Sequence, residues 1–397
     1  MDKSKRSRIL FLNQMAGPLF RELAEDISMH WPVGELFTGH PDTLKSQQKE
    51  FMRIVPAPTY DRRSHMLRLW SWFKYLFCAF FECLRTNKET ILFLVSPPFL
   101  NLIAYFFKKL RRQRFVILVY DIYPNAAVNF GPLKDTGIIA RLWRYINRKV
   151  WENAEIVFTI GNKMAANLET MFDSSKTAAG KVIVIPNWAN TDWIKPLAKE
   201  KNEFAKKYDQ IGKLTVMYSG NLGQTHDIST ILKAARELKG NDSIRFMIIG
   251  EGAKKSIVEQ AKSEDDLNNL TVLGFQPETV LPYSLATADI AVITLDKGSE
   301  GLSVPSKTYY SMASGAALIA LCEEDSEVAL TIRKHDCGFV IKPGDTDAMV
   351  KAILELLGDE EKLKRYQTNS RQAAERFYSR KNTGQYIEAL GNIKLLQ

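Results

Sequence analysis

Hydrophobic runs of four to six residues alternate with helical patterns along the whole 397-residue chain. Between two of these runs, residues 138–150 carry apolar side chains at helical spacing. Alternating strands and helices favour parallel sheets with right-handed crossovers, and a chain of this length accommodates two of them. We therefore expect an α/β fold of two doubly wound, Rossmann-like domains facing a cleft. The predicted strands are 9–12, 91–95, 115–120, 155–160, 181–185, 214–218, 244–249, 270–273, 289–293, 317–321 and 338–341.

A polar segment separates the two halves of this pattern. Residues 190–213 follow Pro186-Asn-Trp188, contain Pro196 and carry a run of charges, which is typical of a linker. We expect a first domain over 1–195, a second over 196–376, and a final helical segment over 377–397.

Charge is distributed unevenly between the halves. The first 195 residues hold 28 Lys and Arg against 17 Asp and Glu, a net charge of +11, whereas the rest carries −2. All seven tryptophans also precede residue 195. A basic half suits nucleic acid or an anionic membrane, and tryptophan favours the membrane interface. We therefore expect a peripheral membrane contact through the first half and no nucleic-acid partner.

Two further observations bear on location and redox chemistry. The four cysteines form no C-x-x-C pair, which disfavours zinc sites and disulfides. The first residues run directly into a strand without the pattern of a signal peptide. The expected location is cytoplasmic, at the inner face of the cell membrane.

Residues 66–85 are apolar nearly all round, with charges at Arg68, Lys74 and Glu82. The uncharged run is too short to span a bilayer, so a helix in the membrane interface and a helix buried in the first domain are both open. The cationic run at 106–114 favours lipid, although a solvated helix end explains it too.

A phosphate site is predicted in the second half. Gly301 opens a loop that leads through Pro305 to Ser306 and Lys307, and an apolar strand follows. Pro305 suits the first turn of a helix, where free N–H groups and the dipole hold an anion, and Lys307 adds a cation. We interpret this stretch as the seat of a diphosphate.

Other turns follow predicted strands. Gly220, Asn221 and His226 form a candidate ligand loop, whose alternative is a turn ending in the helix cap Asp227. Gly250 and Gly252 close the next strand, and alone they indicate only a turn.

Asp121, Gly17 and the motif Asp345-Thr-Asp347 each allow a functional and a purely structural interpretation. Asp121 ends a strand and suits orienting or deprotonating a hydroxyl, although a capped turn is equally compatible. Gly17 either passes close to a substrate or makes a plain turn. Asp345-Thr-Asp347 has the form of a metal motif but is better explained as a helix cap, so no metal site is predicted.

Taken together and in order, these motifs resemble those of the family 4 glycosyltransferases of the B-type fold, especially the bacterial branch that builds envelope, capsule and O-antigen polysaccharides. The matching segments are 121–124, 185–188, 218–223, 250–252, 274–275, 288–289, 305–307 and 312–315.

The resemblance implies a hexosyltransferase that retains anomeric configuration and needs no metal or other cofactor. A nucleotide-sugar, with UDP favoured over GDP, is bound by the second domain and a lipid-linked glycan acceptor by the first. Lys307 and Asp121 are the implied catalytic residues, Phe275 lies near the nucleobase, and a C-terminal helix crosses back to the first domain. The implied donor contacts are Gly17, Gly220, Asn221, His226, Gly250, Gly252, Phe275, Ser306 and Tyr310.

The sequence also departs from the family pattern. Leu302 and Tyr310 stand where the family has two glutamates, and Asn221 and His226 replace an arginine and a lysine. Glu300 is close to the lost carboxylates. The missing glutamates leave a non-catalytic, membrane-associated binding subunit as one alternative. A nucleotide-sugar 2-epimerase of similar two-domain build is the other.

Overall fold

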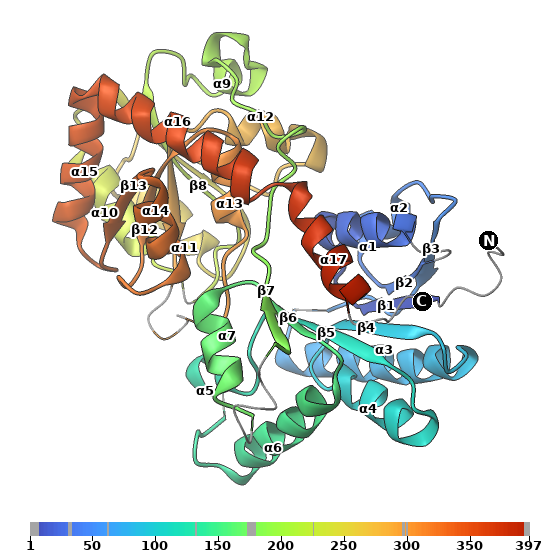
Figure 1. Cartoon of the computed structure of the whole chain (residues 1–397). Helices are drawn as coiled ribbons and strands as arrows, with labels where there is room; N and C mark the ends of the chain where they lie inside the picture. The colour runs from blue at the N-terminus through green and yellow to red at the C-terminus, as the bar shows by residue number, and fades with distance from the viewer. Residues whose placement is uncertain are drawn as a thin grey trace. The chain divides into compact units, whose positions relative to one another are not determined.

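The structure is a computed structural model that describes residues 8–30, 34–61, 63–131, 133–172, 180–224, 226–295, 298 and 301–392. It divides into two units, the first comprising residues 1–186 and 381–397 and the second residues 187–380. We had expected boundaries at 195/196 and 376/377. Each unit is a parallel sheet covered by helices, which confirms the predicted α/β class (Figure 1).

The first unit is built on seven parallel strands in the order β3-β2-β1-β4-β5-β6-β7. Five were predicted, whereas β2 and β3 were missed because their apolar runs are interrupted by Gly34, Glu35, Arg53 and Pro56. The strands are β1 (Ile9–Asn13), β2 (Gly34–Thr38), β3 (Met52–Pro56), β4 (Ile91–Ser96), β5 (Phe115–Val119), β6 (Val157–Thr159) and β7 (Val182–Val184).

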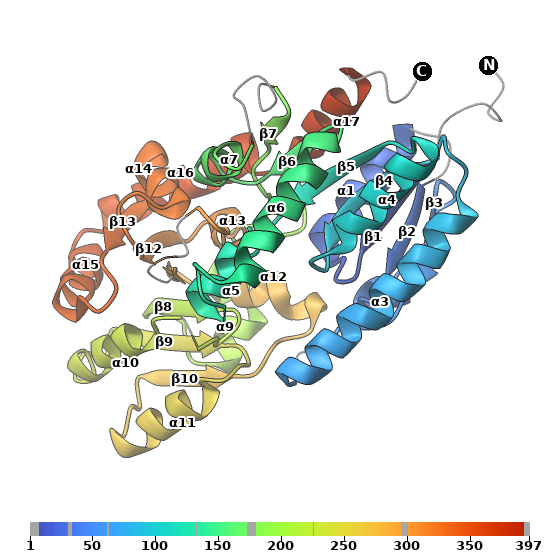
Figure 2. The same ribbon diagram turned by 90° about the horizontal axis from the view of Figure 1, so that it is seen from below.

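Helices cover both faces of this sheet. Helices α3, α4 and α6 lie side by side on one face, and α1 and α17 lie on the other (Figures 1 and 2). Helix α17 is attached by Thr383, whose Oγ1 donates to Asp26 Oδ2 at 2.8 Å, and by Tyr386, whose ring centroid lies 4.7 Å from that of Phe158. The helices are α1 (Pro18–His30), α2 (Pro41–Lys45), α3 (His65–Arg85), α4 (Leu100–Arg111), α5 (Asn125–Phe130), α6 (Ile138–Asn153), α7 (Asn162–Glu169) and α17 (Thr383–Asn392).

Helix α3 is neither fully buried nor detached from the core. Tyr75, Ala79 and Cys83 are completely buried, and Tyr75 Oη donates to the Phe37 carbonyl at 2.9 Å. The opposite side of the helix is exposed and apolar. No helix among the described residues is long and apolar enough to cross a membrane.

Three of the tryptophans that the structure describes do not lie where the charge argument expected them. Trp143, Trp151 and Trp188 are buried, so they fill cores. Trp70 and Trp193 are exposed, and Trp193 belongs to the second unit. The number of tryptophans in the first half is therefore weak support for a membrane contact, and only α3 carries that argument further.

The second unit is built on six parallel strands in the order β10-β9-β8-β11-β12-β13, all of them predicted. Central strands buried on both faces consist of continuous apolar runs, and this made them visible in the sequence. The strands are β8 (Leu214–Ser219), β9 (Ile244–Ile249), β10 (Leu270–Leu273), β11 (Ile290–Thr294), β12 (Ala317–Leu321) and β13 (Gly338–Ile341).

One core of this unit joins the sheet to α10, α11 and α15. The predicted linker 190–213 is not a linker, because it belongs to this unit and packs on it. Lys199 Nζ donates to Thr215 Oγ1 at 2.8 Å, and Asn202 Nδ2 donates to Thr287 Oγ1 at 3.0 Å. The helices are η2 (Lys199–Lys201), α9 (Glu203–Lys207), α10 (Ile228–Glu237), α11 (Lys255–Glu264), η3 (Glu278–Val280), α12 (Leu281–Leu285), α13 (Lys307–Ala313), α14 (Glu327–His335), α15 (Thr346–Gly358), α16 (Glu360–Phe377) and, at the unit boundary, η4 (Arg380–Asn382).

Candidate functional site

Three loops pack in a row at the carboxyl ends of β8, β9 and β10 in the second unit. Backbone hydrogen bonds join the first two, from Gly220 N to the Ile249 carbonyl at 2.9 Å and from Leu222 N to the Glu251 carbonyl at 2.8 Å. Gly250 N continues the row by donating to the Leu273 carbonyl at 2.9 Å. Ligands of doubly wound sheets bind at this edge, so the row is the natural place for one.

Glycine allows these loops to come so close. A Cβ on Gly250 would lie 1.9 Å from the Gly220 carbonyl oxygen, and one on Gly252 would lie 2.5 Å from the Leu222 carbonyl oxygen. Both distances are impossible for real carbon atoms. The structure thus gives Gly250 and Gly252 a packing role that shapes the loop at Gly220.

Lys307 meets this row from the segment after β11, the strand next to β8 in the sheet. Its Nζ lies 4.1 Å from the centroid of the Tyr218 ring, within the range of a cation–π contact. A Cβ on Gly220 would lie 3.5 Å from Lys307 Cδ, so the lysine stem runs directly past that glycine. The predicted cation and the predicted glycine loop therefore meet in the structure.

Tyr218 also organises the loop after β8. Its hydroxyl donates to the Asn221 carbonyl at 2.7 Å and lies 2.8 Å from His226 Nδ1, which itself lies 2.7 Å from that carbonyl. Lys254 Nζ donates to the His226 carbonyl at 2.6 Å and so ties the loop to the start of α11. The Asn221 residue is exposed.

The helix after the phosphate motif begins later than expected. Helix α13 starts at Lys307 with Ser306 as its N-cap, so Pro305 precedes the helix and does not lie in its first turn. The Ser306 side chain caps no backbone N–H, and this residue is exposed. Tyr310 is half-buried one turn into the helix. Because α13 has only seven residues, Lys307 is a more substantial source of positive charge here than the helix dipole.

Phe275 lies on the third loop of the row and is 56% exposed. Next to it, Gln276 Nε2 donates to the Gly274 carbonyl at 2.9 Å. Gly274 is close to Glu251, which pairs with Lys255 at 2.6 Å. A free aromatic face therefore stands beside the row of loops.

In the first unit, Asp121 follows β5. The residue is exposed to solvent on one side, yet the protein around it raises the pKa of its carboxyl to about 6 through desolvation. Burial, and secondly the charge of Asp121, raise the pKa of Tyr123 to about 12. A carboxyl with such a pKa is ionised at neutral pH and readily accepts a proton, which suits a general base.

Gly17 precedes α1 in the same unit. A Cβ there would meet only His40 Nε2, at 3.8 Å, which is ordinary contact. The backbone at this position therefore does not require glycine for its own packing.

The two aspartates that the sequence presented as caps are caps. Asp345 accepts from Ala348 N at 3.0 Å at the start of α15, so the D-x-D interpretation as a capping motif is confirmed. Asp227 accepts from Thr230 N at 3.1 Å. Burial alone would raise the Asp227 pKa, but hydrogen bonds from Thr230, Ser229 and Gly344 outweigh it and lower the value.

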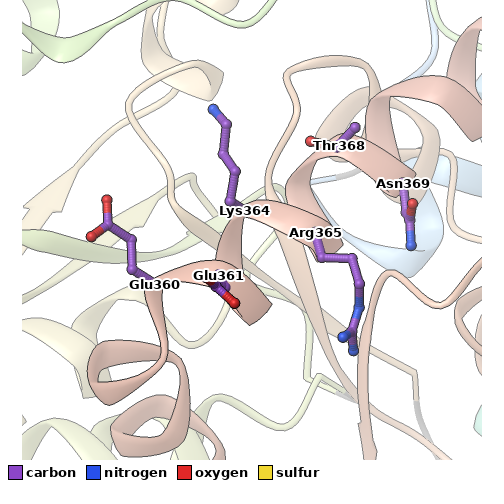
Figure 3. Close-up of a pocket in the computed structure, with 6 residues that line it drawn as sticks. All are labelled: Glu360, Glu361, Lys364, Arg365, Thr368 and Asn369. Carbon is purple, nitrogen blue, oxygen red and sulfur yellow. The ribbon is translucent and has the colours of Figure 1, made fainter.

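A surface hollow elsewhere in the second unit is not a competing site. It is lined by residues of a single helix, α16, whose side chains fan outward (Figure 3). They do not converge on a common point, as a ligand site requires. Its lining residues are Glu360, Glu361, Lys364, Arg365, Thr368 and Asn369.

Two residues of the site were not singled out from the sequence. Tyr218 ends a predicted strand and begins the matching segment 218–223, and an aromatic residue just before a glycine loop is the available signal. Lys254 follows Gly250 and Gly252, which alone indicate only a turn. Glu300, considered as a substitute carboxylate, lies outside the described residues, and Leu302 is buried.

Comparison with known proteins agrees with this geometry. Residues 199–373, which contain the whole row of loops and Lys307, match the family described as "Glycosyl transferases group 1". The chain is 30% identical over 243 residues to "Probable glycosyltransferase WbjE" of Pseudomonas aeruginosa, covering 61% of this chain and 60% of that protein. It is 24% identical over 294 residues to "Putative colanic acid biosynthesis glycosyl transferase WcaI" of Escherichia coli strain K12, covering 73% and 69%.

Among solved structures, Anabaena Alr3699/HepE in complex with UDP and glucose superposes with a TM-score of 0.73 at 14% identity, over 97% of this chain and 100% of that one. At this identity the likeness shows the fold alone, and it is the two-domain B-type glycosyltransferase fold. Within that class, the match over residues 199–373 shows a group 1 glycosyltransferase domain in the second unit, as the resemblance predicted.

Proposed function

We propose that the protein transfers a sugar from a nucleotide-sugar to a glycan acceptor carried on polyprenyl diphosphate, in the synthesis of a bacterial envelope polysaccharide. The printed names of the two relatives, a probable glycosyltransferase and a putative colanic acid glycosyltransferase, support this. The UDP bound by HepE supports a UDP-sugar over a GDP-sugar as donor.

One observation carries the proposal: Lys307 and the Gly220 loop, far apart in the sequence, meet at the carboxyl edge of a parallel sheet. When the bond between the sugar and the diphosphate breaks, negative charge grows on the phosphate that leaves. A fixed ammonium stabilises that charge more in the transition state than in the ground state, which is what accelerates the reaction.

The remaining residues of the second unit have supporting roles in this proposal. Ser306 and the backbone N–H group of Asn221 donate to phosphate oxygens, together with His226, and Gly220 lets the loop come close to the ligand. Gly250 and Gly252 keep the loop in place, and Phe275 stacks on the nucleobase. Tyr310, one helical turn from Lys307, faces the ribose.

On the acceptor side, Asp121 orients the attacking hydroxyl and takes its proton. The raised pKa of this carboxyl, about 6, supports the role because it brings the basicity of the carboxylate closer to neutrality. Gly17 leaves room near the donor sugar. In this scheme the acceptor hydroxyl attacks from the face that the diphosphate leaves, so the sugar keeps its anomeric configuration. No metal takes part, because Lys307 supplies the charge that a metal supplies in other transferases.

The test is an assay of purified protein with labelled UDP- and GDP-sugars, each with and without a prenyl-diphosphate-linked acceptor. Labelled lipid product only when both substrates are present, with the donor's anomeric configuration and unchanged activity in EDTA, is the expected result. Conversion of the free nucleotide-sugar without acceptor would indicate the epimerase. Binding of donor with no turnover on any acceptor would indicate the non-catalytic subunit.

A further inference from the structure

The outer face of α3 carries a continuous apolar stripe. Its residues recur three or four positions apart, and at 100° per residue they fall within about 80° of the helix circumference. Ser71, Tyr75, Ala79 and Cys83 form the opposite, buried face. The stripe consists of Met66 (76% exposed), Trp70 (54%), Phe73 (57%), Phe77 (58%), Phe81 (47%) and Leu84 (45%).

The aromatic side chains of this stripe pack against one another. The rings of Trp70 and Phe73 stack with centroids 5.5 Å apart, and those of Phe77 and Phe81 meet edge to face at 4.9 Å. A soluble helix normally turns polar residues outward, so six large exposed apolar side chains in one row indicate an interaction surface.

Neighbouring helices extend the same surface. Phe80 of α3 contacts Phe106 of α4, with centroids 5.8 Å apart, and Phe106 is 48% exposed. Helix α6 packs beside α4 on the same face of the sheet and exposes Ile138 and Leu142 (Figure 2). The outward sides of all three helices therefore point away from one sheet in a common direction.

The charge on these helices identifies what covers them. Helices α3, α4 and α6 contain ten Lys and Arg residues and two Glu, a net charge of +8 in a chain of net charge +9. Lys74 lies over the ring of Trp70 at 5.4 Å, so its flexible stem follows the apolar stripe while its ammonium can reach outward. In a dimer formed through this face, two sets of helices with a net charge of +8 each would face one another, and their repulsion disfavours self-association. An apolar surface surrounded by cations instead matches a bilayer that contains anionic lipid.

The first turns of α3 also reach the carboxyl edge of the sheet in the first unit. Gln14 Nε2, after β1, donates to the Ser71 carbonyl at 3.1 Å. Arg68 acts electrostatically on Tyr123, which in turn feels the charge of Asp121. The start of α3 therefore lies at the carboxyl edge of the sheet, and Asp121 follows β5 at the same edge.

We propose that the outer face of α3, extended by α4 and α6, docks on an anionic bilayer. The helix, about 31 Å long, lies in the plane of the membrane and inserts its apolar stripe about 5–10 Å deep. Docking presents Asp121 to a diphosphate-linked glycan at the membrane surface, and this last point rests on the proposed function.

The experiment uses the full chain with vesicles of phosphatidylcholine, alone or with 30% phosphatidylglycerol, at low and high salt. The wild type should bind the anionic vesicles, and its tryptophan fluorescence should shift to shorter wavelength on binding. The binding should weaken as the salt concentration rises. The triple variant Phe73→Glu, Phe77→Glu and Phe81→Glu should bind at least tenfold more weakly. The control Ile257→Glu, Leu330→Glu and Leu354→Glu changes equally exposed helical positions of the second unit and should bind like the wild type.

Several outcomes would overturn the docking surface. They are absence of wild-type binding, equal binding by the α3 variant, or a wild-type dimer in light scattering that the α3 variant converts to monomer. Transfer to a water-soluble, short-chain acceptor is measured in parallel. Transfer without vesicle binding refutes the docking surface alone, whereas vesicle binding without transfer on any acceptor refutes the proposed function alone.

Discussion

The two units share one architecture but differ at the carboxyl ends of their strands. In the second unit, glycine loops pack against one another and against Lys307, so the candidate donor site is a closely packed backbone structure next to a cation. In the first unit, the candidate residue is a single carboxyl with a raised pKa, beside a helix whose outer face is apolar and exposed. The difference suggests that a small, charged and chemically constant ligand is held by the second unit, and a bulky, variable one by the first.

The largest effect should come from Lys307. Replacing it by alanine removes the ammonium that we assign to the departing phosphate, and turnover should fall by about 100- to 1000-fold, as for other groups that stabilise a developing anion. The matched control is Lys233→Ala, which removes an exposed lysine on α10 in the same unit. Steady-state kinetics and a melting curve of each variant make the comparison, and near-normal turnover by Lys307→Ala at unchanged stability would contradict the assignment.

Asp121 tests the other half of the comparison. As the proposed base it must be ionised, and because its pKa is raised to about 6, the active fraction is lost as pH falls through 6. The kcat/KM profile should therefore rise with pH and level off above about 6. Asp121→Asn should lower the rate by about 100-fold and remove the fall of kcat/KM at low pH. If kcat/KM of the asparagine variant still falls at low pH, another group is responsible for the titration.

The sequence predicted the second unit better than the first, for physical reasons. The strands of the second sheet are rich in consecutive apolar residues, so all six were recognised. Strands β2 and β3 are as long as β1, but each keeps only a brief apolar run beside Glu35 or Arg53, so their pattern does not separate them from loops. The segment 190–213 has the composition of a linker, yet Lys199 and Asn202 anchor it through contacts that composition does not reveal.

The same contrast holds for the candidate site. Gly220 and Lys307 were recognisable because glycine turns and a lysine near a helix start have local signatures. The sequence did not reveal that Lys307 lies over the ring of Tyr218 next to Gly220, because this contact depends on β8 and β11 being neighbours in the sheet. The exposure of one side of α3 was also beyond the sequence, since an all-round apolar pattern does not say which side faces the core.

Gly250 sharpens the view that the donor side is a packed backbone structure. In Gly250→Ala the new methyl group would lie 1.9 Å from the Gly220 carbonyl oxygen, so the two loops must move apart. We expect the free energy of unfolding to fall by about 1–3 kcal/mol, the usual cost of overpacking. Gly240→Ala is the control, because a Cβ there meets no atom within 4 Å, and chemical denaturation should show little change for it.

Phe275 should show the smallest effect, confined to donor affinity. Its ring is 56% exposed beside the glycine loops, and stacking of a nucleobase on an aromatic ring contributes about 1–3 kcal/mol. Phe275→Ala should therefore weaken UDP binding by roughly tenfold in calorimetry, at the lower end of that range because the face is open to water. Phe275→Tyr keeps the ring and should bind like the wild type, whereas Phe275→Leu keeps apolar area without a flat face. If leucine restores full affinity, the ring contributes only burial, and the nucleobase is recognised elsewhere in the second unit.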